Sequence, residues 1–318
     1  MFKLRRNYPI AKLSTFQIGG RAGYFCEVKS FNDFLKAVET AKQSGVSYKI
    51  VAGGSNVVFP DGQLNHLLIK IKNLTYPAIK AIGTKIEADS GANLMRLIKK
   101  AVAGGLSGLE TLSGIPGTVG GAIVGNAGAY GQSISGALER VLVWDPVQNK
   151  KLWLDKNECH FQYRHSIFKE QPYLILRAVF KFSAKGGSAS GGNKERIVEL
   201  KTISNNIIAT RLKKYPAGLR CPGSFFKNVL VKEISAKSLK LINQEKIIEG
   251  KIPSGYLLEQ IGAKGMRMGG IRIADFHGNL LINDGRARSE DVKKLSRILK
   301  NKVQKKFGIN LEEEVRYF

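Results

Sequence analysis

Residues 113–131 read SGIPGTVGGAIVGNAGAYG, with a glycine at almost every third position and no charged side chain. A second bare turn, AGGSN at 52–56, follows an apolar run typical of a buried strand. Glycine lets the main chain approach a flat ring closely or present successive N–H groups to an anion. Tight turns and close packing are the alternative explanation. Two such loops in a chain with 24% charged residues favour a large ligand.

Both standard nucleotide-binding fingerprints are missing from the sequence. No G-x-G occurs, and no glycine-lysine pair is followed by serine or threonine. The Rossmann and P-loop interpretations therefore lose their main support. What remains is a pair of loops that can cradle something flat or phosphorylated.

Composition bounds the class of protein. The 318 residues include 43% hydrophobic residues, enough for two or three domains with real cores. No apolar run approaches a membrane span or a signal peptide, so we expect a cytoplasmic protein that is not inserted in membranes. We also expect a monomer. The three cysteines, Cys26, Cys159 and Cys221, lie far apart and predict neither a disulfide framework nor a metal site.

The formal net charge of +26 raises nucleic acid as a partner. Lysines are spread over most expected helix faces, and aromatic residues do not alternate with them as on a stacking platform. A solvated surface is the favoured interpretation, and we expect no nucleic-acid partner. A positive field around a pyrophosphate ligand is a further explanation.

Periodicity predicts an alternation of strands and helices. Residues 23–30 and 47–53 read as strands around a helix at 31–45 that Ser30 caps. Later segments follow the same logic: a helix at 93–105, a hairpin turning at 145–149, a strand at 173–183, a low-complexity loop at 184–194, a helix from about 195, helices at 254–262 and 289–308, and a terminal strand.

The fold class expected is α+β. Two α/β subdomains span 1–72 and 73–213, an α+β domain spans 214–307, and 308–318 form a strand held by another sheet.

Seven further motifs occur in a fixed order along the chain. They are STFQIGGRAGYF, VAGGSNVVFPDG, GLETLSGIPGTVGGAIVGNAGAYG, YRHSIFK, GSFFKN, LINDGRARSEDV and LEEEVR. Together they resemble the UDP-N-acetylenolpyruvoylglucosamine reductase family almost end to end. The glycine loops alone would indicate only the wider superfamily of vanillyl-alcohol-oxidase/PCMH-like FAD-binding domains. The short interval between YRHSIFK and RLKKYP is similar to the shorter, type II branch.

The resemblance implies two cofactors, FAD and NADPH, and a set of flavin-binding residues. The first two subdomains would bind FAD and the third the substrate. Residues matched to the pyrophosphate are Gly53, Gly54, Ser55 and Asn56. Those matched to the flavin ring and ribityl chain are Ile115, Pro116, Gly117, Val119, Gly121, Asn126, Gly128 and Ala129, and Val57, Gly120 and Tyr130 complete the cofactor-binding set.

The reaction implied belongs to peptidoglycan precursor synthesis. NADPH reduces the flavin, and hydride then passes to the enolpyruvyl double bond of UDP-N-acetylglucosamine enolpyruvate, giving UDP-N-acetylmuramate. Negative charge builds beside the substrate carboxylate, so the site needs a cation and a proton donor. Arg164 would bind the carboxylate, Ser224 would donate the proton, and Glu314 would face the same intermediate. Tyr163, Lys214 and Asn228 match residues that contact substrate or nicotinamide cofactor.

Two of these catalytic candidates, and the two glutamates before the third, also have ordinary structural explanations. Arg164 could form a surface salt bridge, Ser224 could cap a turn, and Glu312 and Glu313 could be solvated charges. If 311–316 form a strand, period two places Glu312 and Glu314 on one face. Val229 stands where the family usually has proline, which leaves the substrate-domain geometry there open.

Two rival functions remain at this stage. Another FAD-dependent oxidoreductase of the same fold would keep both glycine loops without needing Arg164, Ser224 and Glu314 together. A basic RNA-binding protein on an inactive flavin fold would retain RNA in a salt-dependent way and lack bound flavin.

Overall fold

The structure, a computed structural model, describes residues 2–183 and 193–318. Contacts divide the chain into two compact units. Unit 1 comprises Met1–Arg6, Tyr24–Gly53 and Asn65–Lys213, and unit 2 comprises Asn7–Gly23, Gly54–Leu64 and Lys214–Phe318. Most of the expected low-complexity loop, 184–192, lies outside the described residues. The division into four segments stays a prediction.

A five-stranded antiparallel sheet forms the centre of unit 1, in the order β11–β10–β12–β7–β6. The expected hairpin is confirmed, because Asp145 pairs with Lys150 across its turn. Asp145 Oδ1 also accepts hydrogen bonds from the N–H groups of Val147 and Gln148, which fixes the turn. The strands are β6 (Ile79–Ile82), β7 (Lys85–Asp89), β10 (Leu138–Asp145), β11 (Lys150–Asp155) and β12 (Leu174–Lys181).

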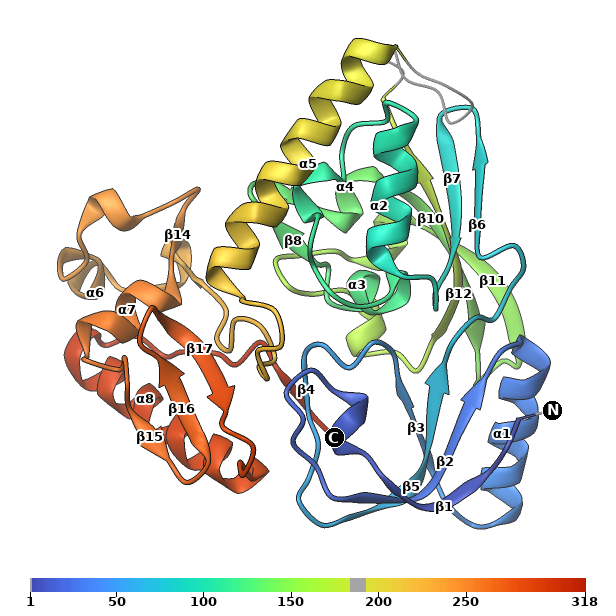
Figure 1. The fold of residues 1–318 in the computed structure, drawn as a ribbon, viewed down its shortest axis with the longest axis horizontal. Coiled ribbons are helices and arrows are strands. Elements are labelled where there is room, and N and C mark those ends of the chain that lie inside the picture. Colours follow the sequence, from blue (N-terminus) through green and yellow to red (C-terminus); the bar gives the residue numbers. More distant parts are fainter. Residues whose placement is uncertain (1, 184–192) are drawn as a thin grey trace. The chain divides into compact units, whose positions relative to one another are not determined.

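Helices cover one face of this sheet (Figure 1). They are α2 (Leu94–Ala103), α3 (Val119–Val124), α4 (Ile134–Ala137) and α5 (Lys194–Lys214). Asn93 caps α2 by accepting a hydrogen bond from Arg96 N, and Gly104 ends it, as expected for the helix at 93–105. Leu94, Leu97 and Ile98 of α2 are fully buried, so its apolar stripe faces the core.

A second sheet has the order β1–β2–β5–β3, in which β3 and β5 run parallel. Its strands are β1 (Arg5–Pro9), β2 (Arg21–Val28), β3 (Tyr48–Val51) and β5 (Gln63–Ile71). Helix α1 (Phe31–Gln43) follows β2, and Ser30 accepts a hydrogen bond from Asp33 N. The predicted strand, helix and strand are therefore confirmed, together with the cap.

Unit 2 is built around a three-stranded sheet and two helices. The sheet has the order β15 (Arg267–Met268), β16 (Ile271–Ala274) and β17 (His277–Asn283). Helices α7 (Ser254–Gln260) and α8 (Ser289–Phe307) pack on it, and their apolar side chains form its core. The smaller elements of the chain are β4 (Val57–Val58), β8 (Gly128–Ala129), β9 (Gln132–Ser133), β13 (Val229–Leu230), β14 (Lys251–Ile252), β18 (Arg316–Tyr317) and α6 (Ala236–Lys240).

The prediction that residues 308–318 form a strand is largely wrong. Only Arg316–Tyr317 forms a strand, β18, which pairs in parallel with β4. Before it, a single bridge joins Phe226 to Glu313. The Glu313 carboxylate lies 2.7 Å from Lys300 Nζ, accepts a hydrogen bond from Ser296, and its side chain is only 18% exposed. Glu313 is therefore not a solvated charge. Its side chain points toward Lys300 and Ser296 on α8, and the alternation of a strand does not determine its orientation.

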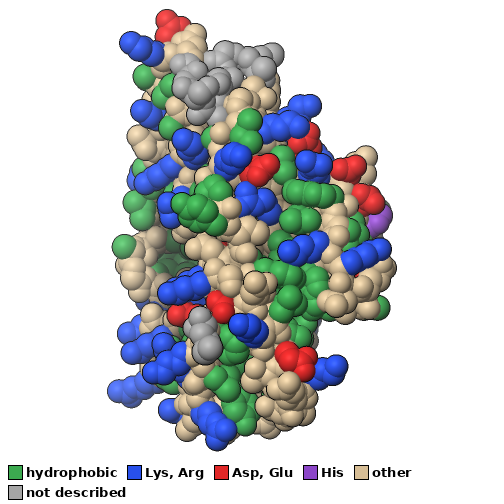
Figure 2. All heavy atoms as spheres, turned by 90° about the vertical axis from the view of Figure 1, so that its right-hand side faces the viewer, with side chains coloured by type: hydrophobic (Ala, Val, Ile, Leu, Met, Phe, Trp, Pro, Cys, Tyr) green, Lys and Arg blue, Asp and Glu red, His purple; other side chains and the backbone are tan. Residues whose placement is uncertain are grey.

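Basic side chains are scattered over the face drawn in Figure 2, between hydrophobic and neutral ones, without forming one continuous band. Among the described residues, no helix is both long and apolar enough to cross a membrane.

Candidate functional site

The glycine-rich segment packs main chain against main chain in unit 1. It lies against residues 90–94, the turn after β7, where Gly120 N donates to Ser90 O over 2.8 Å and Val119 N donates to Ala92 O over 2.9 Å. A Cβ built on Gly120 would lie 2.9 Å from Ser90 Cβ, which is too close for a real side chain. Close packing therefore explains why residue 120 is a glycine, which is the sequence-based alternative to ligand binding.

The two glycine loops meet at Gly53 and Gly117, both in unit 1. A Cβ on Gly53 would lie 2.7 Å from Gly117 Cα and 3.4 Å from Thr118 N. Gly117 itself has φ +126°, a conformation that side chains rarely adopt. The loops expected to bind one ligand are therefore neighbours, with bare backbone between them.

A tight turn, Gln162–His165, is docked on the end of the glycine segment. Gln162 and His165 exchange two backbone hydrogen bonds of 3.1 Å, and Asn126 Nδ2 donates to Gln162 O over 2.8 Å. Arg164, within the turn, has φ +56°, and its Nη1 donates to Gly128 O over 3.0 Å. A left-handed conformation at a non-glycine residue is costly and frequent at functional sites. The turn thus holds Arg164 beside the expected flavin-binding residues 126–130.

Among the buried polar atoms with no hydrogen-bond partner in the described part of the chain, three belong to the glycine loops or to the turn packed against them. They are Asn126 Oδ1 and Ser90 Oγ in unit 1, and Asn56 Oδ1 in unit 2. Asn126 is only 8% exposed and Ser90 5%. Buried polar atoms are normally paired, so these atoms suit a bound ligand with donors of its own. The residues present fit FAD, whose flavin ring and ribityl hydroxyls carry such donors.

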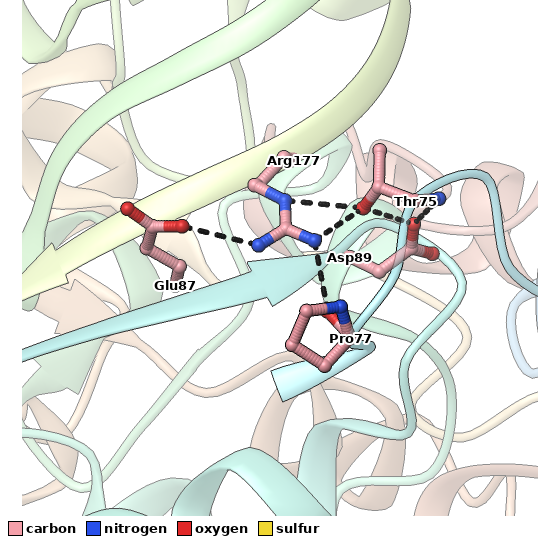
Figure 3. Close-up of polar contacts among 5 residues, drawn as sticks. All are labelled: Thr75, Pro77, Glu87, Asp89 and Arg177. Carbon is pink, nitrogen blue, oxygen red and sulfur yellow. Dashed lines mark hydrogen bonds and ion pairs between the residues drawn. The ribbon is translucent and has the colours of Figure 1, made fainter. Parts of the chain in front are cut away.

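A buried ionic network fixes the chain just before Ser90 (Figure 3). Arg177 of β12 donates to Thr75 Oγ1 over 2.7 Å, to Pro77 O over 2.8 Å and to Glu87 Oε2 over 3.1 Å. Asp89 accepts hydrogen bonds from Thr75 Oγ1 and, at its other oxygen, from Gly91 N over 2.7 Å. Asp89 therefore ties the turn that supports Gly120 to Thr75 through one carboxylate oxygen and to Gly91 through the other.

Ser224 lies in unit 2, on a loop held by β17. Its Oγ is 3.0 Å from the Tyr215 hydroxyl. Asn279, 2% exposed, accepts from Phe226 N and donates to Phe226 O, each over 2.8 Å, while its own carbonyl accepts from Phe225 N. One asparagine therefore satisfies three backbone groups and sets the path of the chain directly after Ser224.

Glu314 is brought to the same loop. Its N–H donates to Phe225 O over 2.8 Å, so its main chain sits one residue from Ser224. Glu314 O accepts a hydrogen bond of 3.0 Å from Asn56 Nδ2, which ties the Gly54–Asn56 turn to the chain end within unit 2. Three expected site residues, 258 positions apart at the extremes, thus share one region.

The remaining expected residues make contacts of their own within each unit. The Arg164 guanidinium lies 5.6 Å from the Tyr163 ring centroid, Tyr130 is 52% exposed with φ +49°, and Asn228 Oδ1 accepts from Ser254 N at the start of α7. Lys214 Nζ lies 5.3 Å from the Tyr215 ring centroid. Unit 1 carries Gly53, Ile115, Pro116, Gly117, Val119, Gly120, Gly121, Asn126, Gly128, Ala129, Tyr130, Tyr163 and Arg164, and unit 2 carries Gly54, Ser55, Asn56, Val57, Lys214, Ser224, Asn228 and Glu314.

His277 begins β17 close to Lys214. Burial, with a smaller effect from the Lys214 charge, lowers the pKa of His277 to about 4. Its Nδ1 accepts a hydrogen bond of 3.1 Å from Asn279 N, which leaves the proton of the neutral ring on Nε2. His277 is therefore a neutral imidazole at physiological pH and supports Asn279.

Known families match both ends of the chain. Residues 22–145 match the family FAD binding domain, and residues 215–318 match UDP-N-acetylenolpyruvoylglucosamine reductase, C-terminal domain. A UDP-N-acetylenolpyruvoylglucosamine reductase from Solibacter usitatus is 38% identical, over 97% of this chain and 95% of the relative. The chain belongs to the UDP-N-acetylenolpyruvoylglucosamine reductase family.

Other members of this family are also similar to the chain over nearly its whole length. The reductase of Caldicellulosiruptor bescii is 34% identical over 98% of this chain and 90% of its own length. The crystal structure of the Thermus caldophilus enzyme superposes over 100% of both chains with a TM-score of 0.74 and 25% identity. The α+β fold class, the reductase activity in peptidoglycan precursor synthesis, and FAD and NADPH as cofactors, all expected from the sequence, are confirmed.

Sequence reasoning missed two residues that contact Ser224 or the chain directly after it. Tyr215 carried no signal, because a tyrosine beside lysine and proline fits any loop. Asn279 carried a weak sequence signal. It lies in the apolar stretch HGNLLIN, and an asparagine buried in such a strand needs hydrogen-bond partners.

Proposed function

We propose that the chain reduces UDP-N-acetylglucosamine enolpyruvate to UDP-N-acetylmuramate with Arg164, Ser224 and Glu314 as catalytic residues. When bound, FAD supplies the redox chemistry, taking hydride from NADPH and passing it to the methylene carbon of the substrate. The observation that carries the proposal is the joint placement of Ser224 and Glu314. The Glu314 N–H donates to the residue directly after Ser224.

The flavin would be bound by the main chain of the two glycine loops and by two buried side-chain amides. In unit 1, residues 115–130 and Gly53 offer bare main chain, and Asn126 offers a buried Oδ1 with no partner among the described residues. In unit 2, the turn Gly54–Asn56 with Val57 offers main chain to phosphate, and Asn56 is held by Glu314 O. Each of these groups can meet a donor or an anion without a side-chain cation.

Substrate chemistry falls to the polar side chains. The Arg164 guanidinium would bind the substrate carboxylate in the two-pronged geometry that suits both groups and stabilise the charge that develops beside it. Ser224 would then donate its hydroxyl proton to the neighbouring carbon, and Glu314 would orient the groups around it. Tyr163, Lys214 and Asn228 would contact substrate or nicotinamide cofactor, with Lys214 offering a point charge to phosphate.

We also infer that the enzyme works as a cytoplasmic monomer without nucleic-acid partner or membrane insertion. Its substrates are small nucleotide-linked molecules, and on the face drawn in Figure 2 the basic side chains form no continuous track for a polyanion.

Replacing Ser224 tests the proposal. In anaerobic rapid mixing, Ser224→Ala is expected to leave reduction of the flavin by NADPH nearly intact and to slow reoxidation by substrate by about 10²- to 10⁴-fold. Ser44→Ala, at an exposed position, serves as the control and should leave both steps unchanged. Equal damage to both steps in Ser224→Ala would mean that Ser224 is structural.

A further inference from the structure

The Tyr215 hydroxyl contacts the Ser224 hydroxyl directly, and the reaction proposed above suggests what this contact does. The two oxygens are 3.0 Å apart, and either can be the donor. If Tyr215 donates, the Ser224 proton stays free to point at a bound substrate. The inference drawn from this contact rests on the role proposed for Ser224.

Serine is a weak acid, and giving up its proton leaves an alkoxide. A phenol is a stronger acid than an aliphatic alcohol, so a second transfer from Tyr215 to Ser224 relieves that charge. The Lys214 ammonium lies over the Tyr215 ring, 5.3 Å from its centroid. Tyr215 is partly exposed, which allows it to recover a proton from water.

His277, a titratable group near Lys214, does not suit this task. His277 lies close enough to Lys214 for the lysine charge to affect it, and burial keeps its imidazole neutral at physiological pH. Its Nδ1 is already occupied as an acceptor from Asn279 N. A neutral imidazole is a poor acid, whereas Tyr215 touches the serine oxygen directly.

We propose that Tyr215 is a further catalytic residue, a relay that reprotonates Ser224 as Ser224 protonates the substrate. The Ser224 O–H bond breaks as the new C–H bond forms at the carbon beside the carboxylate. The Tyr215 O–H bond breaks as the Ser224 O–H bond re-forms, so the negative charge of the substrate intermediate ends on the phenol oxygen. That oxygen then takes a proton from solvent, and no further oxidant or reductant is needed.

The test replaces Tyr215 by phenylalanine in the flavin-loaded enzyme, which keeps the ring beside Lys214 and removes the hydroxyl. Reoxidation by substrate is expected to slow by about 10- to 100-fold, part of the 10²- to 10⁴-fold that general acids contribute. Tyr76→Phe removes a hydroxyl from a side chain that is 96% exposed and is the matched control, expected to behave as wild type. Melting temperatures, read without substrate, should agree within about 2 °C, since one partly exposed hydrogen bond is lost.

A proton inventory separates a relay from a merely structural contact. In mixtures of H₂O and D₂O, the reoxidation rate of the wild type should depend on the deuterium fraction along a curve, because two protons move together. Tyr215→Phe should give a flatter curve than the wild type, because one solvent-exchangeable proton fewer moves. In the Ser224→Ala background, Tyr215→Phe should cause no further slowing, because the two residues act as a unit.

The possible failures are distinct. If Ser224→Ala does not slow reoxidation, the role proposed for Ser224 is wrong and the relay falls with it. If Ser224→Ala is slow while Tyr215→Phe keeps the wild-type rate and the wild-type inventory curve, the relay alone is overturned.

Discussion

Replacing Gly53 by alanine tests whether the two glycine loops are glycine-rich because their backbones touch. The new Cβ would lie 2.7 Å from Gly117 Cα and 3.3 Å from Gly117 C, against about 3.5–4.0 Å for comfortable carbon contacts. Both neighbours are main-chain atoms, so the loops must part by about 1 Å. Overpacking of this kind costs about 1–3 kcal/mol, slightly offset by the lower entropy of the unfolded alanine chain.

Gly136 in α4 supplies the matched control, because a Cβ there meets no atom within 4 Å. Gly136→Ala should be neutral or stabilising by up to about 1 kcal/mol. Melting of the flavin-free proteins is the assay, with an expected drop of about 2–10 °C for Gly53→Ala, and flavin content after purification should fall as well. If both variants melted alike and retained flavin equally, the packing explanation would be wrong.

The remaining predictions concern β17. Asn279→Ala leaves Phe226 N–H and C=O unpaired in a buried place, so it should cost about 2–5 kcal/mol in the free energy of unfolding by urea, whereas Asn301→Ala, on an exposed position of α8, should change it by less than about 0.5 kcal/mol. If Asn279→Ala did not change the free energy of unfolding, Asn279 would not stabilise the loop after Ser224. The pKa of His277 is lowered to about 4 in the folded protein, against about 6.5 when unfolded, so the unfolded chain binds more protons between these values and the contribution of His277 to stability is lost as the pH falls from about 6.5 to 4. The stability difference between wild type and His277→Gln should therefore shrink from pH 7.5 to pH 4.5, and a constant difference would contradict the lowered pKa.

Local signals explain which elements were predictable. Helices α1 and α2 carry a capping residue, an apolar stripe and a closing glycine within one short segment, so their bounds follow from neighbouring residues. The hairpin of β10 and β11 depends on Asp145 and its own turn. The chain end was mispredicted because Glu313 takes its partners from α8, which periodicity within 308–318 cannot reveal.

The candidate site also has features that the local sequence predicts and features that only the fold reveals. Glycine loops indicated a cradle because their chemistry is local, and motif resemblance supplied FAD and the three catalytic candidates. The link from Asn126 to Gln162, the link from Asn56 to Glu314 and the Tyr215–Ser224 contact join segments that meet only in the fold. Their energies depend on burial and direction, which no single stretch of sequence encodes.

Flavin absorbance followed through both half-reactions tests the central claim most directly. Under anaerobic conditions NADPH should bleach the flavin of the purified protein, and UDP-N-acetylglucosamine enolpyruvate added next should restore the colour with formation of UDP-N-acetylmuramate. Bleaching without recovery on that substrate would contradict the assignment of the glycine cradle, Arg164, Ser224 and Glu314 to one reductase reaction.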